Sequence, residues 1–118
     1  TVVSRLKRKE TSMNTQYKKG VLELCVLSLL KKRDCYGYEI SEFLAGHIDI
    51  ADGTVYPILR KLKADGRFTT YLQEKSGGPP RKYYTLTRLG RETYEADRAE
   101  YLTFAAAIRN LLEEDEQK

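Results

Sequence analysis

The residues whose types and spacing suggest chemistry lie between Asp52 and Gly66. Four apolar side chains recur there at helical spacing, which places them on one side of a helix: Val55, Ile58, Leu59 and Leu62. Polar and cationic side chains fall on or near the other side: Thr54, Arg60, Lys61 and Lys63. Such a helix can be held by a core while it offers cations and hydrogen-bonding groups to the major groove of DNA. The alternative interpretation is an ordinary surface helix with solvated lysines.

The distribution of charge favours an anionic partner. Residues 1–91 carry 18 basic and 9 acidic residues, whereas residues 92–118 carry 3 and 8, within a formal net charge of +4. The basic part therefore contains the cationic helix, which is typical of a protein that binds an anion such as nucleic acid. Solvated basic loops would give the same balance, so charge alone does not distinguish a protein that binds an anion from one whose basic loops are only solvated.

The start of the cationic helix is ambiguous in the sequence. Asp49 and Asp52 resemble a weak capping box, and a start near Ala51 would lack a good cap. With such a start, Pro57 lies beyond the first turn, where it removes a backbone hydrogen bond. We therefore expect a kink or a tight first turn at Pro57, and an end at Asp65 and Gly66.

A β-hairpin is predicted directly after this helix. Side chains alternate from Arg67 to Lys75 and again from Arg81 to Leu86, around the Gly/Pro-rich tip at residues 76–80. Arg81 and Lys82 flank the tip, where a phosphate backbone would attract them.

Two further helices are predicted before the cationic one. The first runs from Tyr17 to Lys32 and is apolar nearly all round, so it needs cover on more than one side. A partner subunit could supply part of that cover, so we include Leu22 and Val26 in a candidate dimer interface. The second opens at Tyr36–Ile40 and reaches about Ala45, with Gly46 as its stop and His47 as a loop or capping residue.

A long helix closes the chain, from Arg88 to about Glu113, with Thr87 as its N-cap. Its apolar stripe protrudes beyond what so small a core can cover, and a second copy of the chain is the simplest partner for it. The stripe consists of Tyr94, Tyr101, Phe104, Ala105, Ile108, Leu111 and Leu112.

The order of these elements predicts an α+β fold, mostly α, of the winged helix-turn-helix type with a two-stranded wing and a long C-terminal dimerisation helix. We expect this winged domain over residues 13–87 and the dimerisation helix with its acidic tail over residues 88–118. For residues 1–12 we expect either a tag remnant or a disordered arm, with Met13 as the native start. In such a fold the third helix enters the major groove, and the wing tip approaches the DNA backbone or the minor groove.

Four stretches in this order resemble the PadR family of bacterial transcriptional regulators, specifically its short, single-domain subfamily. They are Met13–Gly20, Tyr36–Ile40, Asp52–Leu62 and Gly78–Thr87. The resemblance implies a homodimeric regulator, usually a repressor, that binds a roughly palindromic operator in double-stranded DNA. By position, it implies that Thr54, Tyr56 and Arg60 face DNA and that the Gly77–Arg81 region, including Gly78, is the wing tip.

The same resemblance implies a dimer joined largely through the last helix. The residues implied at the dimer seam are Tyr101, Phe104, Ile108 and Leu111. Some family members bind a small planar aromatic effector near this seam, and Tyr101 and Phe104 could line such a pocket. The alternative, which we favour, is that both rings are simply packed in the interface.

Other classes of protein fit the sequence less well. The chain offers no nucleophile–base pair, metal-binding cluster or phosphate-binding glycine loop, so we expect no enzyme, no cofactor and no metal. Cys25 and Cys35 make no disulfide framework, and no apolar run approaches a membrane span, so we expect a reduced, cytoplasmic protein. The alternative function is a winged-helix module that binds an acidic partner protein.

Overall fold

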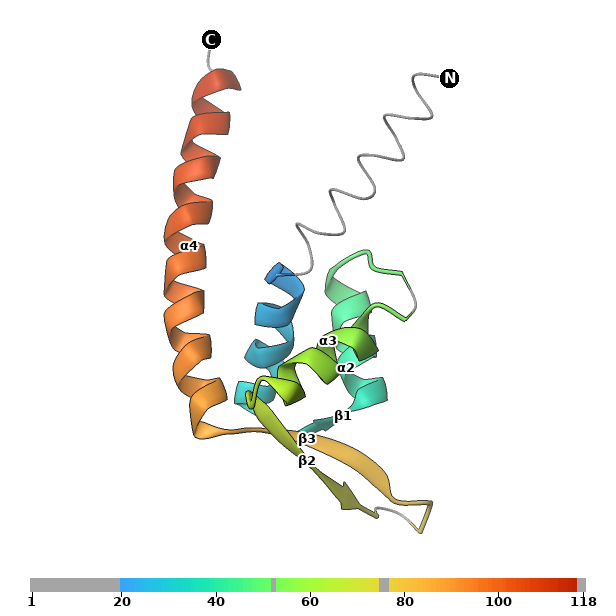
Figure 1. The fold of residues 1–118 in the computed structure, drawn as a ribbon. Coiled ribbons are helices and arrows are strands. Elements are labelled where there is room, and N and C mark those ends of the chain that lie inside the picture. The colour runs from blue at the N-terminus through green and yellow to red at the C-terminus, as the bar shows by residue number, and fades with distance from the viewer. Residues whose placement is uncertain (1–19, 52, 75–76, 117–118) are drawn as a thin grey trace.

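The computed structural model describes residues 20–51, 53–74 and 77–116 of the 118-residue chain (Figure 1). Residues 1–12, predicted to be a tag remnant or an arm, lie outside the described residues, as does Met13. Within the described part, the first helix covers residues 20–32. It is followed by β1 (Cys35–Tyr36), α2 (Gly37–His47), α3 (Val55–Ala64), β2 (Phe68–Gln73), β3 (Arg81–Leu86) and α4 (Arg88–Glu116).

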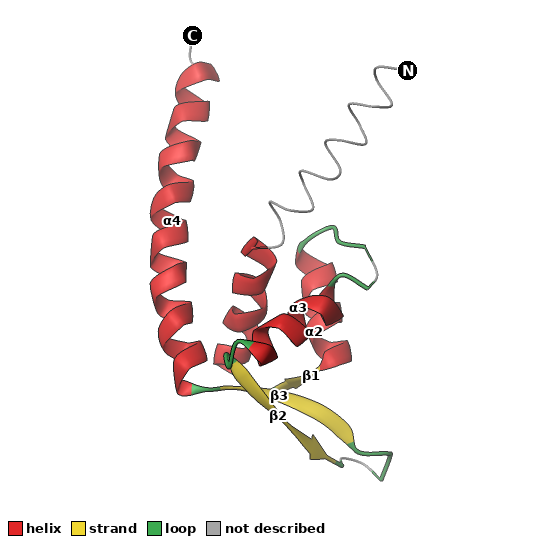
Figure 2. Cartoon of the chain, viewed as in Figure 1, coloured by secondary structure: helices red, strands yellow, loops and turns green. Residues whose placement is uncertain are grey.

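The first helix, α2 and α3 pack on one another and on a three-stranded antiparallel sheet, while α4 rises past the first helix (Figures 1 and 2). The strand order is β1–β3–β2, and the β2–β3 hairpin projects from the helical body. This is the predicted winged helix-turn-helix, mostly helical, with a long C-terminal helix.

The core lies between the helices and one face of the sheet. It contains apolar residues from the first helix, α2, α3 and the sheet, and reaches the start of α4 through Tyr94. The α3 stripe is buried as predicted, with Val55, Ile58, Leu59 and Leu62 each 4% exposed or less. Burial of these four side chains stabilises the position of α3 by roughly 1.5–3 kcal/mol per residue.

Strand β1 was not predicted, because residues 36–40 were expected to open the second helix. It has two residues, and it pairs Cys35 with Tyr84 and Tyr36 with Tyr83. The sheet therefore has three strands rather than the two of the wing alone. Helix α2 also runs to His47, so Gly46 lies inside it and does not stop it.

Pro57 does not interrupt α3, because the helix starts later than predicted. Val55 is its first residue, so Pro57 is the third, and the N–H that proline lacks would have had no helical partner there. The chain enters α3 through a tight turn in which Thr54 donates its N–H to the Ala51 carbonyl at 3.3 Å. The kink or tight first turn expected at Pro57 is therefore wrong, because α3 is continuous from Val55 to Ala64 and the turn lies before the helix.

Thr87 caps α4 as predicted and also joins the helix to the wing. Its Oγ1 accepts the Gly90 N–H at 3.0 Å and donates to the Gly66 carbonyl at 2.7 Å. Two ion pairs attach the next turns of α4 to the body: Lys31 with Glu95, and Arg67 with Asp97 at 3.5 Å. Beyond these turns the apolar side chains of α4 are exposed, among them Phe104, Leu111 and Leu112.

Candidate nucleic-acid interface

Helix α3 turns its polar side outward at its N-terminal end. Tyr56 is 49% exposed, and Arg60, one helical turn later, is exposed as well. Among the described residues, the first turn of α3 holds no acidic side chain, and Thr54 makes no side-chain capping hydrogen bond. The N–H groups of this turn and the Thr54 hydroxyl are therefore available to an anion.

Arg60 of α3 lines a hollow of about 450 Å³ together with side chains from β1, α2 and β3. We name this hollow the cationic concavity. It joins residues that lie up to 48 positions apart in the sequence. It is lined by Tyr36, Gly37 and Tyr38 from β1 and α2, by Tyr56 and Arg60 from α3, and by Arg81, Lys82 and Tyr84 from β3. Three cations and four tyrosine side chains in one hollow suit a phosphate backbone, which accepts charge-assisted and neutral hydrogen bonds.

Gly37 allows the close contact between α2 and α3 at this hollow. A Cβ on Gly37 would lie 3.1 Å from Cε1 and 3.2 Å from Oη of Tyr56. The missing side chain therefore leaves room for the Tyr56 ring against the first residue of α2. As a result, the N-terminal ends of the two helices lie next to each other at the hollow.

The wing cation Arg81 is held at the rim of the cationic concavity. Its guanidinium carbon lies 4.5 Å from the centroid of the Tyr36 ring, within the range of a cation–π interaction. Tyr38 also lines the hollow, and a hydrogen bond to the Glu42 carboxylate raises the pKa of its phenol.

Lys61 does not line the cationic concavity, although it was predicted with Arg60. Its Nζ lies 2.8 Å from Glu23 Oε1 and 3.6 Å from Asp65 Oδ2. The hydrogen bond to Glu23 raises the pKa of Lys61. Its charge is therefore already matched by two carboxylates, and a contact between Lys61 and DNA stays a prediction.

The glycines of the predicted wing tip lie in the exposed turn between β2 and β3. Gly77 has a φ of 71°, a left-handed conformation that favours glycine. A Cβ on Gly77 or Gly78 would meet no atom within 4 Å, so the tip is open to a partner. Neither glycine lines the cationic concavity, and their contact with DNA also stays a prediction.

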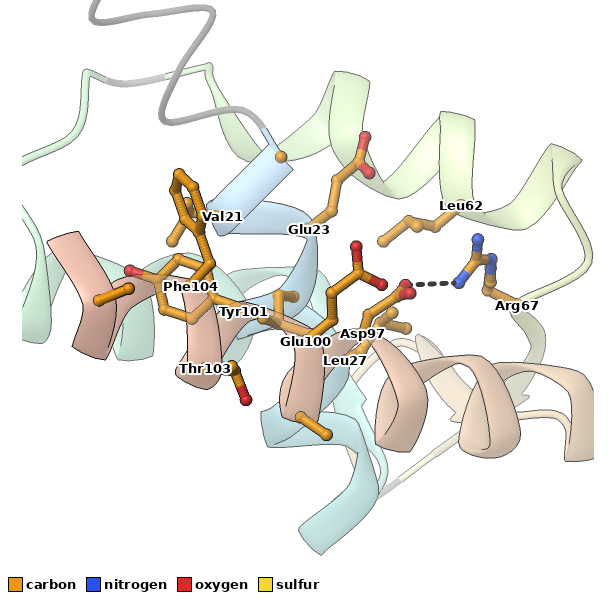
Figure 3. Close-up of a pocket in the computed structure, with 14 residues that line it drawn as sticks. Val21, Glu23, Leu27, Leu62, Arg67, Asp97, Glu100, Tyr101, Thr103 and Phe104 are labelled. Carbon is orange, nitrogen blue, oxygen red and sulfur yellow. Dashed lines mark ion pairs between the residues drawn. The ribbon is translucent and has the colours of Figure 1, made fainter.

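A second hollow, which we name the α4 groove, separates the first helix from α4 (Figure 3). Its volume is about 880 Å³. Tyr101 and Phe104 of α4 are directed toward Val21 of the first helix, and the Arg67–Asp97 ion pair closes one end (Figure 3). Further along α4, Ile108 lies in a smaller hollow of about 440 Å³ with the same two rings, and Leu111 is 61% exposed.

Leu22 and Val26 differ from the expectation that placed them in a dimer interface. They are 3% and 0% exposed, inside the core of a single chain. The cover that the first helix needs comes from the other elements of the same chain. The first-helix residues that line the α4 groove are Gly20, Val21, Glu23, Leu24 and Leu27.

Tyr36, Gly37, Tyr38 and Tyr84 were not predicted as site residues. Three of them form the Tyr-Gly-Tyr sequence at a helix start. A glycine there indicates close packing against another element only when that element, here α3, is known. Within the described ranges, no group of three or more His, Cys, Asp and Glu residues could hold a metal ion. The search of those ranges also finds no helix that could span a membrane.

Comparison with known proteins agrees with this geometry. The sequence profile of the transcriptional regulator PadR-like family matches residues 26–96. A PadR-like transcriptional regulator of Bacillus cereus superposes with a TM-score of 0.75 at 34% identity, over 82% of this chain and 96% of that one. A PadR family regulator of Eggerthella lenta gives a TM-score of 0.73 at 30% identity, over 92% and 96% of the two chains. A PadR family regulator of Clostridium difficile gives 0.71 at 29% identity, over 77% and 97%.

Proposed function

The chain belongs to the transcriptional regulator PadR-like family, whose members are DNA-binding regulators and not enzymes, and on that premise we propose that it is a homodimeric repressor of a palindromic operator. The observation that carries the proposal is the cationic concavity, because it joins the exposed side of α3 to the cations of the wing. Such a protein works in the cytoplasm, where the bacterial chromosome lies.

In the proposed complex, α3 lies in the major groove and the wing follows the backbone. Arg60 is long enough to reach a base edge, where a guanidinium forms its most specific contacts with guanine. Arg81 and Lys82 of β3 neutralise phosphates, and Tyr56 and Thr54 donate hydrogen bonds near the N-terminus of α3. Phosphate contacts supply affinity and register, and Arg60 contributes sequence preference.

The second copy is supported by the exposed apolar side chains of α4. Phe104, Leu111 and Leu112 are each about 60% exposed in the single chain, an arrangement that a partner helix would cover. A two-fold axis through α4 would present two α3 helices to one face of DNA, with half-sites about 34–36 Å apart or a multiple of that spacing. Repression follows if the operator overlaps a promoter.

A small aromatic effector in the α4 groove is a secondary part of the proposal. The groove is large enough for one, and Tyr101 and Phe104 offer faces for stacking. The simpler role for both rings is packing against the partner chain, and we give that role precedence.

The test is selection of bound duplexes from a random DNA pool, followed by light scattering of the protein alone and of the complex. We expect enrichment of an inverted repeat and two chains per duplex, with affinity that falls steeply as salt rises. A pool without enrichment, together with a flat salt response, would contradict the proposal. Capture of an acidic protein from a nuclease-treated lysate would then support the protein-interaction alternative.

A further inference from the structure

Three tyrosines form a row across the outer face of the sheet. The strand register pairs Tyr71 of β2 with Tyr83 of β3, and Tyr36 of β1 with the same Tyr83. The opposite face carries Cys35, Phe68 and Tyr84 and belongs to the main core. Tyr83 is only 5% exposed although it lies outside that core, so the buried ring is covered on the outer face.

The three rings contact one another in sequence. Tyr71 and Tyr83 stack, with centroids 5.6 Å apart and planes at 15°. Tyr83 and Tyr36 meet edge to face, with centroids 5.5 Å apart and planes at 68°. Both arrangements are favourable for aromatic pairs.

A charged side chain contacts each of the two outer rings of the row. At one end, the Tyr71 hydroxyl donates a hydrogen bond to Asp34 Oδ2 at 2.7 Å, although Asp34 precedes β1 and Tyr71 lies on β2. Since β3 lies between these two strands, the Tyr71 side chain spans the sheet. At the other end, the Tyr36 ring carries the Arg81 guanidinium at 4.5 Å.

This row of tyrosines stabilises the β2–β3 hairpin of the wing. A two-stranded hairpin that projects from a body is marginally stable alone, and Arg81 is the first residue of β3 after the tip. The Asp34–Tyr71 hydrogen bond attaches β2, the hairpin strand that does not pair with β1, to the segment before β1. The rings of Tyr71 and Tyr83 in turn limit the movement of the Tyr36 ring, and the Arg81 guanidinium packs on that ring.

We infer that Asp34 and Tyr71 are positioning residues for DNA binding: their hydrogen bond holds the wing, and the Tyr83 and Tyr36 rings then fix Arg81 at the rim of the cationic concavity. The inference rests on the proposed function and adds to it two residues that need not touch DNA. A cation already held in place loses less conformational freedom when a phosphate binds to it. The contribution of Tyr71 to affinity therefore depends on Arg81.

The test is a double-mutant cycle of Tyr71→Phe and Arg81→Ala, measured with the duplex enriched from the random pool. Tyr71→Phe keeps the stacked ring and removes only the hydroxyl, so we expect binding weaker by roughly three- to tenfold. The slope of log K against log salt should stay unchanged in Tyr71→Phe, because Arg81 keeps its charge, and should fall by about one in Arg81→Ala, which loses a phosphate contact. In the Arg81→Ala background, Tyr71→Phe should cause no further loss.

The matched control is Tyr94→Phe at the start of α4, which removes a hydroxyl from a core tyrosine outside the cationic concavity and should leave both affinity and slope unchanged. Wild-type affinity in Tyr71→Phe would overturn the inference. Equal losses from Tyr71→Phe with and without Arg81 would overturn it too, because the hydroxyl would then act independently of the cation.

A measurement without DNA separates this inference from the proposed function. The Tyr36 ring current should shift the NMR signal of the Arg81 Nε–H, and the shift should shrink in Tyr71→Phe. An Arg81 signal at its random-coil position in the wild-type chain would overturn the inference, whether or not the protein binds DNA. Failure of the wild-type chain to bind any duplex would instead contradict the proposed function.

Discussion

Lys61 Nζ lies 2.8 Å from Glu23 Oε1, so a cation of α3 is bound to a carboxylate of the first helix. Its neighbour Arg60 lines the cationic concavity. Two consecutive cations on one helix therefore differ in what they can offer to DNA. The difference is testable because each can be removed without touching the buried side of α3.

Arg60→Ala should weaken binding to the selected operator by ~1–3 kcal/mol, the cost expected for a lost base contact. Lys61→Ala should cost less than about 1 kcal/mol, since its charge is half-exposed and already paired with carboxylates. Fluorescence anisotropy titrations at one fixed salt concentration measure both. An equal loss in the two variants would show that Lys61 leaves Glu23 to bind DNA.

Local patterns were sufficient for the elements whose residues are neighbours in sequence. The buried side of α3 follows from its helical spacing, and the bounds of β3 follow from the alternation between the Gly/Pro tip and the Thr87 cap. Strand β1 could not be predicted in this way. It has two residues, and its existence depends on pairing with Tyr83 and Tyr84, nearly 50 positions away.

The residues of the candidate site also fall into these two classes, those set by local sequence and those set by tertiary contacts. Thr54, Tyr56 and Arg60 are local to α3, and the exposure of Tyr56 and Arg60 follows from the burial of the other side of the helix. The contribution of Tyr36 and Gly37 to the same hollow is a tertiary contact, as is the Glu23–Lys61 pair. The burial of Leu22 and Val26 likewise depends on which elements cover the first helix, and periodicity does not report that.

Gly90→Ala should destabilise the fold by about 1–3 kcal/mol or more, because a Cβ there would overlap the backbone carbonyl of Arg67. That carbonyl already accepts a hydrogen bond from the Thr87 N–H at 3.1 Å, so it has little freedom to move. Urea denaturation gives the change in the free energy of unfolding.

The matched control is Gly46→Ala, on the exposed surface of α2, where a Cβ meets no atom within 4 Å. It should stabilise the chain by roughly 0.5–1 kcal/mol, since glycine costs backbone entropy in a helix. Similar stabilities for the two variants would mean that α4 does not pack against Arg67 as described.

The Asp34–Tyr71 bond should be visible in a titration of the tyrosines. Hydrogen bonding to the Asp34 carboxylate raises the pKa of Tyr71 to about 12, above its ordinary value of 10.0. Because the folded-state pKa is the higher one, the bond contributes stability that is fully present below pH 10 and is lost as the pH rises through about 12.

Ultraviolet difference spectra of the wild-type chain and of Asp34→Asn should therefore differ in one phenol, which titrates nearer to 10 in the variant. Comparison of the two chains is needed because the pKa values of Tyr38 and Tyr84 are raised as well. Superimposable curves would mean that the carboxylate does not accept the Tyr71 hydroxyl in solution.

Leu111→Asp should dissociate the proposed dimer. Leu111 is 61% exposed in the single chain, so the change leaves the protomer core intact. A buried leucine contributes about 1.5–3 kcal/mol, and a two-fold interface contains it twice, so the dimer dissociation constant should rise at least about 100-fold.

Asn110→Asp adds the same charge on the opposite side of α4 and should leave the dimer intact. Light scattering after size exclusion reports the mass of each variant, and a Leu111→Asp chain that keeps the mass of two copies would remove this face of α4 from the interface.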